Sequence, residues 1–190
     1  MKVGVMGGTF DPIHLGHLRA AETAREALDL ERVLFVPAGR PPHRSSPVAP
    51  GLDRYAMVAL AVADHPGFVA SDVELRRDGP SFTIDTLEAL RAARSGSRFT
   101  LIVGSDSLSE LPGWRQAEQI LSLARVAVVE RPGDASPCPP ELRERVSRIS
   151  GPALDVSATS IRARIAAGGS VRYLLPPGVA EYIEKRELYR

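Results

Sequence analysis

Short apolar runs alternate with longer amphipathic runs along most of the chain. The short runs do not alternate strictly between apolar and polar residues, which is typical of strands that are buried on both faces of a sheet. The pattern predicts five such strands, at 3–6, 33–36, 68–73, 99–103 and 126–129.

The longer runs carry apolar residues at helical spacing. Leu18, Ala21, Ala24 and Leu28 fall on one face of a helix predicted over 15–30. Because strands and helices alternate, the sequence predicts an α/β fold, a Rossmann-like doubly wound parallel sheet with a helical C-terminal portion. We expect one domain over 1–190, of which 155–190 forms the helical subregion. The other predicted helices lie at 54–63, 83–94, 117–123, 160–167 and 177–185.

Composition and charge exclude several classes of protein. The 190 residues are 44% hydrophobic and 25% charged, an ordinary globular composition. The net charge of +1 provides no global field for a nucleic acid or an acidic membrane surface. Apolar runs fall short of the roughly 20 residues that span a bilayer. With Cys138 as the one cysteine, an internal disulfide is excluded and a cytoplasmic location is expected.

The first candidate site follows the first predicted strand, in the stretch Gly-Gly-Thr-Phe-Asp-Pro-Ile-His-Leu-Gly-His over 7–17. Gly7 and Gly8 allow a sharp turn and close approach of a ligand, and the loop then feeds a helix N-terminus that attracts anions. His14 and His17 are three residues apart, so they can face the same way. Gly16 leaves space between them for a flat base. The pattern predicts a phosphate site at the carboxyl edge of the sheet.

This stretch is open to other interpretations. It contains neither Gly-x-Gly-x-x-Gly nor the Gly-Lys-Ser/Thr ending of a P-loop. The two histidines could also bind a metal, but Asp11 is the one acidic residue near them, so the set is incomplete. A further alternative is that the two histidines have no functional role and simply lie in a loop.

The stretch resembles the motif of the nucleotidyltransferases with a His-x-Gly-His element, and most closely that of the bacterial nicotinate-nucleotide adenylyltransferases. The resemblance covers the whole chain, with further anchors at 36–44, 80–87, 104–115 and 156–164. It implies transfer of AMP from ATP to nicotinate mononucleotide, which gives deamido-NAD and pyrophosphate in NAD biosynthesis.

The resemblance also implies roles for residues that contact ATP. His14 and His17 would donate to the α- and β-phosphates, while Arg44 and Arg162 would hold the triphosphate and the departing pyrophosphate. Arg44 stands where the family usually has lysine. Asp106 can accept hydrogen bonds from a ribose. The ATP-binding residues implied are Gly7, Gly8, Thr9, Phe10, Gly16, Gly104, Asp106, Ser157 and Thr159.

The acceptor pocket would be formed by Phe82, Thr83, Trp114 and Arg115. Phe82 replaces the family's usual tyrosine, and Trp114 would lie against the pyridine ring. A plainer role is helix capping, by Ser81 or Thr83 before the helix at 83 and by Ser157 or Thr159 before the next.

A dipole argument supports a phosphate beside Arg162. The predicted helix start at 160 places this cation in the first turn, where it is unfavourable unless an anion is bound.

Mg²⁺ is expected on the phosphates of ATP, largely through water, so no protein metal ligand is assigned. The expected partners are ATP and nicotinate mononucleotide, with no nucleic acid and no membrane, and a homo-oligomer is left open. One alternative is another adenylyltransferase of the superfamily, specific for nicotinamide mononucleotide or phosphopantetheine. The other is a non-catalytic nucleotide sensor, which predicts a broken histidine pair.

Overall fold

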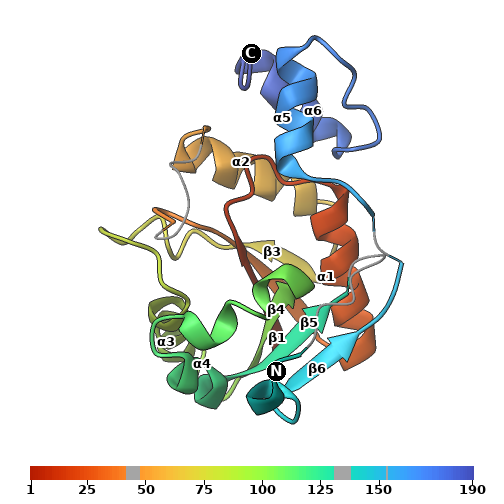
Figure 1. Ribbon diagram of the computed structural model, residues 1–190. Helices are drawn as coiled ribbons and strands as arrows, with labels where there is room; N and C mark the ends of the chain where they lie inside the picture. Colours follow the sequence, from red (N-terminus) through yellow and green to blue (C-terminus); the bar gives the residue numbers. More distant parts are fainter. Residues whose placement is uncertain (42–47, 131–137, 153) are drawn as a thin grey trace.

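The computed structural model describes residues 1–41, 48–130, 138–152 and 154–190 (Figure 1). Strands and helices alternate along the chain, as the hydrophobic pattern predicts. The strands are β1 (Lys2–Gly8), β2 (Arg32–Pro37), β3 (Phe68–Ala70), β4 (Arg98–Gly104), β5 (Ala124–Val129) and β6 (Val146–Ile149). The α-helices are α1 (Leu15–Leu28), α2 (Gly51–Val62), α3 (Thr83–Ala93), α4 (Ala117–Leu123), α5 (Ala158–Ala166) and α6 (Pro177–Lys185), and short 3-10 turns are η1 (Ser105–Ser107), η2 (Leu111–Gly113) and η3 (Pro140–Leu142).

The described strands form a six-stranded sheet in the order β3-β2-β1-β4-β5-β6, and each neighbouring pair is parallel. Val5 of β1 is in register with Leu34 of β2 on one side and Leu101 of β4 on the other. The predicted doubly wound α/β fold is therefore confirmed. The chain winds in opposite directions from β1 and β4, so the carboxyl ends of these two strands flank the crevice where such sheets bind ligands.

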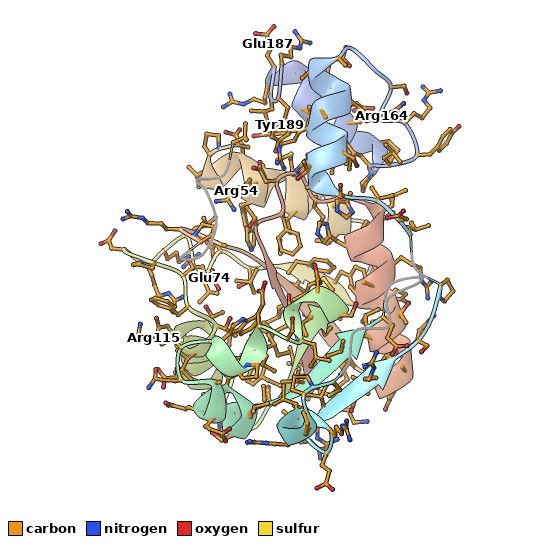
Figure 2. All side chains as sticks on the ribbon, viewed as in Figure 1. Arg54, Glu74, Arg115, Arg164, Glu187 and Tyr189 are labelled. Atoms are coloured by element: carbon orange, nitrogen blue, oxygen red, sulfur yellow. The ribbon has the colours of Figure 1, made fainter. Side chains whose placement is uncertain are left out.

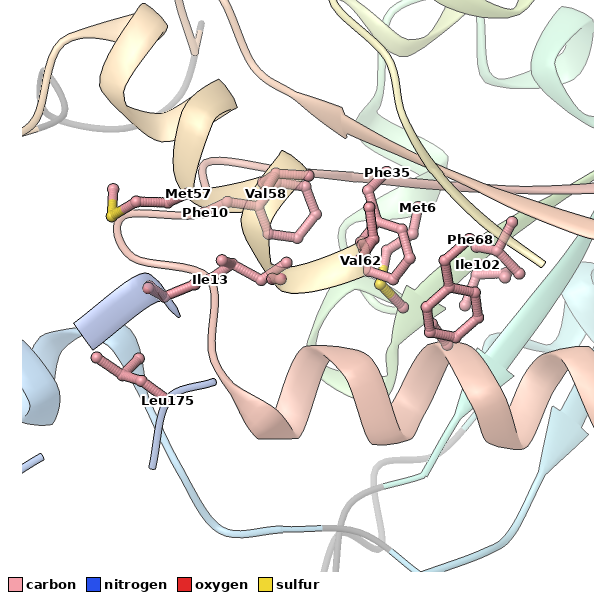
Figure 3. Packing of buried hydrophobic residues seen from close by; sticks show 14 of the residues in the cluster. Met6, Phe10, Ile13, Phe35, Met57, Val58, Val62, Phe68, Ile102 and Leu175 are labelled. Carbon is pink, nitrogen blue, oxygen red and sulfur yellow. The ribbon is translucent and has the colours of Figure 1, made fainter. Parts of the chain in front are cut away.

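Alternate residues of each strand face two separate buried clusters. Met6 and Phe35 belong to the cluster on the α1 face, whereas Val5 and Leu34 belong to the cluster on the α3 face. Helices α1, α2, α5 and α6 supply the first cluster, part of which Figure 3 shows, and α3 and α4 supply the second. Because α5 and α6 pack into the α1-face cluster, the last part of the chain lies beside α2 and the start of α1 (Figure 1).

Most element boundaries differ from the prediction by one to three residues; for example, α1 ends at Leu28 rather than at 30. Helices α2 and α5 begin at Gly51 and Ala158, earlier than the expected 54 and 160. Strand β3 ends at Ala70, so its expected extension to 73 is wrong. Strand β6 was not predicted at all, because two of its four residues, Ser147 and Arg148, are exposed and hide the apolar signal.

Among the described residues, none of the helices is both long enough and apolar enough to cross a membrane.

Candidate active site

The two histidines of the β1–α1 loop lie together at the crevice between β1 and β4. His14 is the N-cap of α1 in an extended conformation and is buried, and His17 follows in the first turn, partly exposed. Their rings stack with centroids 3.7 Å apart and an angle of 24° between the ring planes. The predicted spatial pairing of the histidines is thus present, while their role in phosphate binding stays a prediction.

The contacts of His17 fix how its ring can act. The backbone N–H of His14 donates to Nδ1 of His17 at 3.2 Å. Because Nδ1 accepts this bond, the neutral ring carries its proton on Nε2, which makes Nε2 the donating nitrogen. The Phe10 ring holds His17 from the side, with centroids 5.0 Å apart in an edge-to-face arrangement. Phe10 is 2% exposed, so a contact of its side chain with ATP is ruled out in this conformation and its predicted role rests on the backbone.

The start of α1 offers fewer open donors than the sequence suggests. The N–H of Leu15 donates to the carbonyl of Leu174 at 3.0 Å, and the N–H of His17 donates to the carbonyl of His14 at 3.0 Å. Gly16 packs against the His14 ring, since a Cβ there would lie 3.0 Å from Nδ1 of His14. The glycine therefore makes room for the His14 ring, and its predicted contact with the base of ATP stays a prediction.

Arg162 reaches from α5 to the β1–α1 loop. Its guanidinium donates to the backbone carbonyl of Asp11 at 2.7 Å and to Oγ1 of Thr159 at 3.3 Å. Since α5 begins at Ala158, Arg162 lies in the second turn, and the predicted conflict with the helix dipole is wrong. Ser157 is the N-cap, and its Oγ accepts from the N–H of Ser160 at 3.1 Å, so this capping prediction is confirmed.

Gly7, Gly8 and Gly104 occupy the neighbouring carboxyl ends of β1 and β4. A Cβ at Gly7 would meet nothing within 4 Å, whereas one at Gly8 would approach the Phe10 ring at 3.1 Å. A Cβ at Gly104 would collide with Oδ1 of Asp106 at 2.6 Å, so the exposed Asp106 carboxylate folds back over the strand end. Thr9 is partly buried in the loop between β1 and α1.

The predicted acceptor residues lie at the start of α3 and just before α4, and the structure brings Arg115 and Phe82 together. The Arg115 guanidinium lies 4.7 Å from the centre of the Phe82 ring, and its Nη1 lies 3.7 Å from a carboxylate oxygen of Asp85. Thr83 is the first residue of α3. Trp114 packs partly on the α3-face cluster and lines a cavity of about 300 Å³, whose other lining residues do not include Phe82, Thr83 or Arg115.

The predicted cap before α3 is wrong. Phe82 is the N-cap, and the side chain of Ser81 instead accepts from the backbone N–H groups of Gly39 and Arg40 at 3.0 and 3.2 Å. Ser81 thus ties the segment before α3 to the loop that follows β2.

Residues 5–164 match the cytidylyltransferase-like family. A probable nicotinate-nucleotide adenylyltransferase of Herpetosiphon aurantiacus is 45% identical to this chain over 99% of it and 98% of the relative. The Thermus thermophilus protein of the same name is also 45% identical, over the full length of both. The chain belongs to the nicotinate-nucleotide adenylyltransferase family.

Solved structures agree with this family at the level of the fold. The nicotinic acid mononucleotide adenylyltransferase of Plasmodium falciparum, complexed with APC, superposes with a TM-score of 0.80 at 17% identity, covering 99% of this chain and 96% of the other. The same protein complexed with NaAD gives the same TM-score. A putative nicotinate-nucleotide adenylyltransferase from Vibrio parahaemolyticus matches with a TM-score of 0.68 at 20% identity, over 100% and 95% of the two chains.

Arg44 and the question of a metal site are the remaining points of the sequence-based prediction. Arg44, which stands for the lysine usual in nicotinate-nucleotide adenylyltransferases, lies outside them. Within the described ranges, no three His, Cys, Asp or Glu side chains gather as a set that could hold a metal ion.

Four buried polar side chains near the site were not predicted from the sequence: Asp11, Arg54, Glu74 and Tyr189. The Asp11 carboxylate accepts hydrogen bonds from backbone N–H groups. Burial lowers the pKa of the Arg54 guanidinium and raises the pKa of the Glu74 carboxyl and of the Tyr189 hydroxyl. Asp11 lies in the family motif, but that match does not indicate that its side chain meets Tyr189. Arg54 and Glu74 carried no signal of their own.

Proposed function

We propose that this chain transfers the AMP part of ATP to nicotinate mononucleotide, giving deamido-NAD and pyrophosphate. The observation that carries this proposal is the stacked His14–His17 pair at the β1/β4 crevice, with Arg162 bound to the same loop. Family membership adds the reaction class. The histidines, together with Arg162 of α5, bring hydrogen-bond donors and a cation to the place where a doubly wound sheet binds a nucleotide.

In the proposed reaction, an oxygen of the mononucleotide's 5′-phosphate attacks the α-phosphorus of ATP. A new P–O bond forms, the bond from the α-phosphorus to the bridging oxygen breaks, and pyrophosphate leaves with the electron pair. No protein nucleophile is needed, because alignment of the reactants and stabilisation of charge supply the rate enhancement.

The histidines and arginines would stabilise the charge that develops on the phosphates. We assign Nε2 of His17 as a donor to α-phosphate oxygens, since its Nδ1 is used by the His14 N–H. His14 would donate beside it. Arg162 would bind the triphosphate and pyrophosphate, because it is fixed to the Asp11 carbonyl next to the histidines. Arg44 is proposed for the same anion from the sequence alone.

The remaining ATP contacts are proposed from the sheet edge. The phosphates would lie along the backbone of Gly7, Gly8 and Thr9. The ribose would face Gly104 and Asp106 at the end of β4. Ser157 and Thr159 would add hydroxyl groups from the start of α5.

The mononucleotide would bind against α3 and α4, with Phe82, Thr83, Trp114 and Arg115 around its pyridine ring. The Arg115 guanidinium over Phe82 supports this assignment, because it brings a positive charge to the place where a nicotinate carboxylate would be held.

Nucleotidyltransferases of this kind generally use a divalent metal together with ATP. We propose that the metal is Mg²⁺ and that it enters as part of the MgATP substrate, held by phosphate oxygens and water, which suits its reluctance to lose water. This proposal requires no metal site made by the protein alone.

A pyrophosphate-release assay with ATP, Mg²⁺ and a panel of acceptors tests the proposal. Nicotinate mononucleotide should be the best acceptor, and deamido-NAD should appear by chromatography in equal amount to pyrophosphate. A better rate with nicotinamide mononucleotide or phosphopantetheine would reassign the substrate. Nucleotide binding without turnover would indicate a sensor instead.

A further inference from the structure

Three buried polar side chains meet behind the histidine pair, and we call them the Asp11 hub: Asp11, Arg54 and Tyr189. Their exposures are 5%, 1% and 9%. They come from the β1–α1 loop, from α2 and from the segment after α6, and Figure 2 shows Arg54 and Tyr189 on the side of the molecule where α2 meets the end of the chain.

The Asp11 carboxylate is filled by donors from two other segments. Oδ1 accepts from the hydroxyl of Tyr189 at 2.6 Å and from the N–H of Ala49 at 3.1 Å, and Oδ2 accepts from the N–H of Val48 at 2.8 Å. The backbone carbonyl of the same residue accepts from Arg162 at 2.7 Å. Asp11 therefore joins the histidine loop to the residues before α2, to α5 and to Tyr189.

Arg54 completes the connection with bonds to backbone carbonyls. Its Nη1 donates to the carbonyl of Thr9 at 2.8 Å and its Nε to the carbonyl of Ala49 at 3.1 Å. A third, longer contact of 3.4 Å reaches the carbonyl of Gly39. Since a buried cation needs partners, these carbonyls and the nearby Asp11 charge hold Arg54 in one place.

We infer that the Asp11 hub is a positioning device for adenylyl transfer, in which the Tyr189 hydroxyl fixes the Asp11 loop and thereby the His14–His17 pair and Arg162. The hub residues themselves contact no phosphate. Asp11 is three residues from His14 and accepts the Arg162 bond on its own backbone, so a shift of Asp11 moves both candidate phosphate ligands. This inference rests on the proposed function.

Tyr189 suits such a role because its hydroxyl stays a donor. Burial, and then its bond to Asp11, raise the pKa of Tyr189 well above that of an ordinary tyrosine, so the hydroxyl keeps its proton at any pH at which the protein works. Its ring also belongs to the α1-face cluster, so Tyr189→Phe removes the hydroxyl while keeping the packing.

The chain offers a matched control in Tyr182. The Tyr182 hydroxyl donates to Oδ1 of another buried carboxylate, Asp53, at 2.8 Å. This bond joins α6 to α2, and the hydrogen bonds described for Tyr182 and Asp53 do not reach the histidine loop. Tyr182→Phe therefore removes the same chemical group from a bond of the same kind, without disturbing the candidate site.

Steady-state kinetics of the two variants with ATP and nicotinate mononucleotide test the inference. Tyr189→Phe should lower kcat by about tenfold, since small displacements of positioned groups cost rate, while KM for the mononucleotide stays within about twofold. Tyr182→Phe should keep wild-type kcat. Equal kcat in the two variants, or a change confined to the mononucleotide KM, overturns the inference.

A measurement without turnover separates this inference from the proposed function. The chain has four histidines, so the imidazole signals of a histidine-labelled protein can be assigned by NMR. Tyr189→Phe should shift the His14 and His17 signals and leave His65 in place, and Tyr182→Phe should shift neither site histidine. Unmoved His14 and His17 signals overturn the hub even if the wild type makes deamido-NAD, and shifted signals support it whatever the acceptor proves to be. If Tyr189→Phe does not fold, Asp11→Asn is compared with Asp53→Asn by the same two measurements and the same criteria.

Discussion

The phosphate half and the acceptor half of the candidate site are built in different ways. In the phosphate half, His14, His17 and Arg162 are held through bonds to a loop that the buried Asp11 hub anchors. In the acceptor half, Arg115 lies over Phe82 and near Asp85, but its side chain is 53% exposed. Figure 2 shows this residue by α3, well away from Tyr189.

Exposed charge contacts contribute at most about 1 kcal/mol, whereas buried polar networks are costly to disturb. We therefore expect chemistry to depend on the first half and selectivity to be adjustable in the second.

The largest effect should come from His17→Ala in the phosphate half. One positioned donor to developing charge is worth roughly 10²–10³ in rate, so kcat should fall by that factor while the fold survives. Steady-state kinetics with a circular dichroism melt check this. His65→Ala is the matched control, because His65 is a partly exposed histidine that contacts Glu22 and Phe68 rather than the candidate site. Near wild-type turnover in a folded His17→Ala protein would contradict the assignment.

The wild-type acceptor preference should be the next largest effect. A carboxylate accepts at both oxygens, whereas a carboxamide must turn its NH₂ group toward a donor, and one mispaired buried donor costs roughly 1–3 kcal/mol. We expect kcat/KM for nicotinate mononucleotide to exceed that for the amide by about 5- to 150-fold. Both are measured at saturating MgATP. Equal values would mean that the acceptor half does not distinguish the carboxylate from the carboxamide.

Arg115→Ala should have a smaller effect. Because the guanidinium is more than half exposed, its loss should lower kcat/KM for nicotinate mononucleotide by about threefold and leave KM for ATP unchanged. Arg76→Ala, which removes an exposed arginine paired with Asp72, serves as the control. A rise in the ATP KM would place Arg115 in the phosphate half and remove the contrast.

The last expected effect is on stability alone, with no change expected in turnover, and it concerns Glu74, which is bonded to α3. Its carboxylate accepts from Thr86 of α3 at 2.6 Å, and burial raises its pKa. The folded state then binds this proton more tightly than the unfolded state. Glu74 therefore contributes fully to the free energy of unfolding below its ordinary pKa of 4.5, and this contribution is lost as the pH rises through the raised pKa. The slope is at most about 1.4 kcal/mol per pH unit. Glu74→Gln should flatten this loss in thermal melts recorded as the pH is raised above 4.5.

Glu22→Gln provides a control of opposite sign for Glu74. A hydrogen bond from Arg25 lowers the pKa of Glu22, so its contribution is present above 4.5 and disappears as pH falls. The wild type and Glu22→Gln should therefore differ less in melting temperature at low pH than at pH 7. A pH dependence in Glu74→Gln as steep as in the wild type would show that Glu74 is not its source.

The sequence predicted the elements whose pattern is local and strong. Continuous apolar runs in β1, β2, β4 and β5, and the apolar face of α1, are set by residues within a few positions of each other, so they could be predicted directly. Strand β6 was missed because an edge strand with exposed Ser147 and Arg148 lacks that pattern. The cap of α3 was predicted wrongly because Ser81, a common capping residue, is used by the Gly39 loop instead.

The candidate site also contains residues that could be predicted from a local pattern and residues that could not. The histidine pair could be predicted because both residues lie in one short motif with helical spacing. The Asp11 hub could not, since its hydroxyl and carboxylate are 178 positions apart and only the folded chain brings them together. The same reason explains why a helix start rich in apparent donors proved partly occupied, as the Leu15 N–H meets Leu174 from the far end of the sequence.

That separation has a consequence for synthesis of the protein. A nascent chain can pair β1, β2 and β4 and bury most of both clusters while its later residues are still inside the ribosome, since domains can begin to fold during translation. The histidine loop, however, cannot acquire its Tyr189 bond until position 189 has emerged. A ribosome-bound chain would thus carry a folded sheet with an unfinished site. Full turnover should therefore appear later than protection of the sheet from proteolysis.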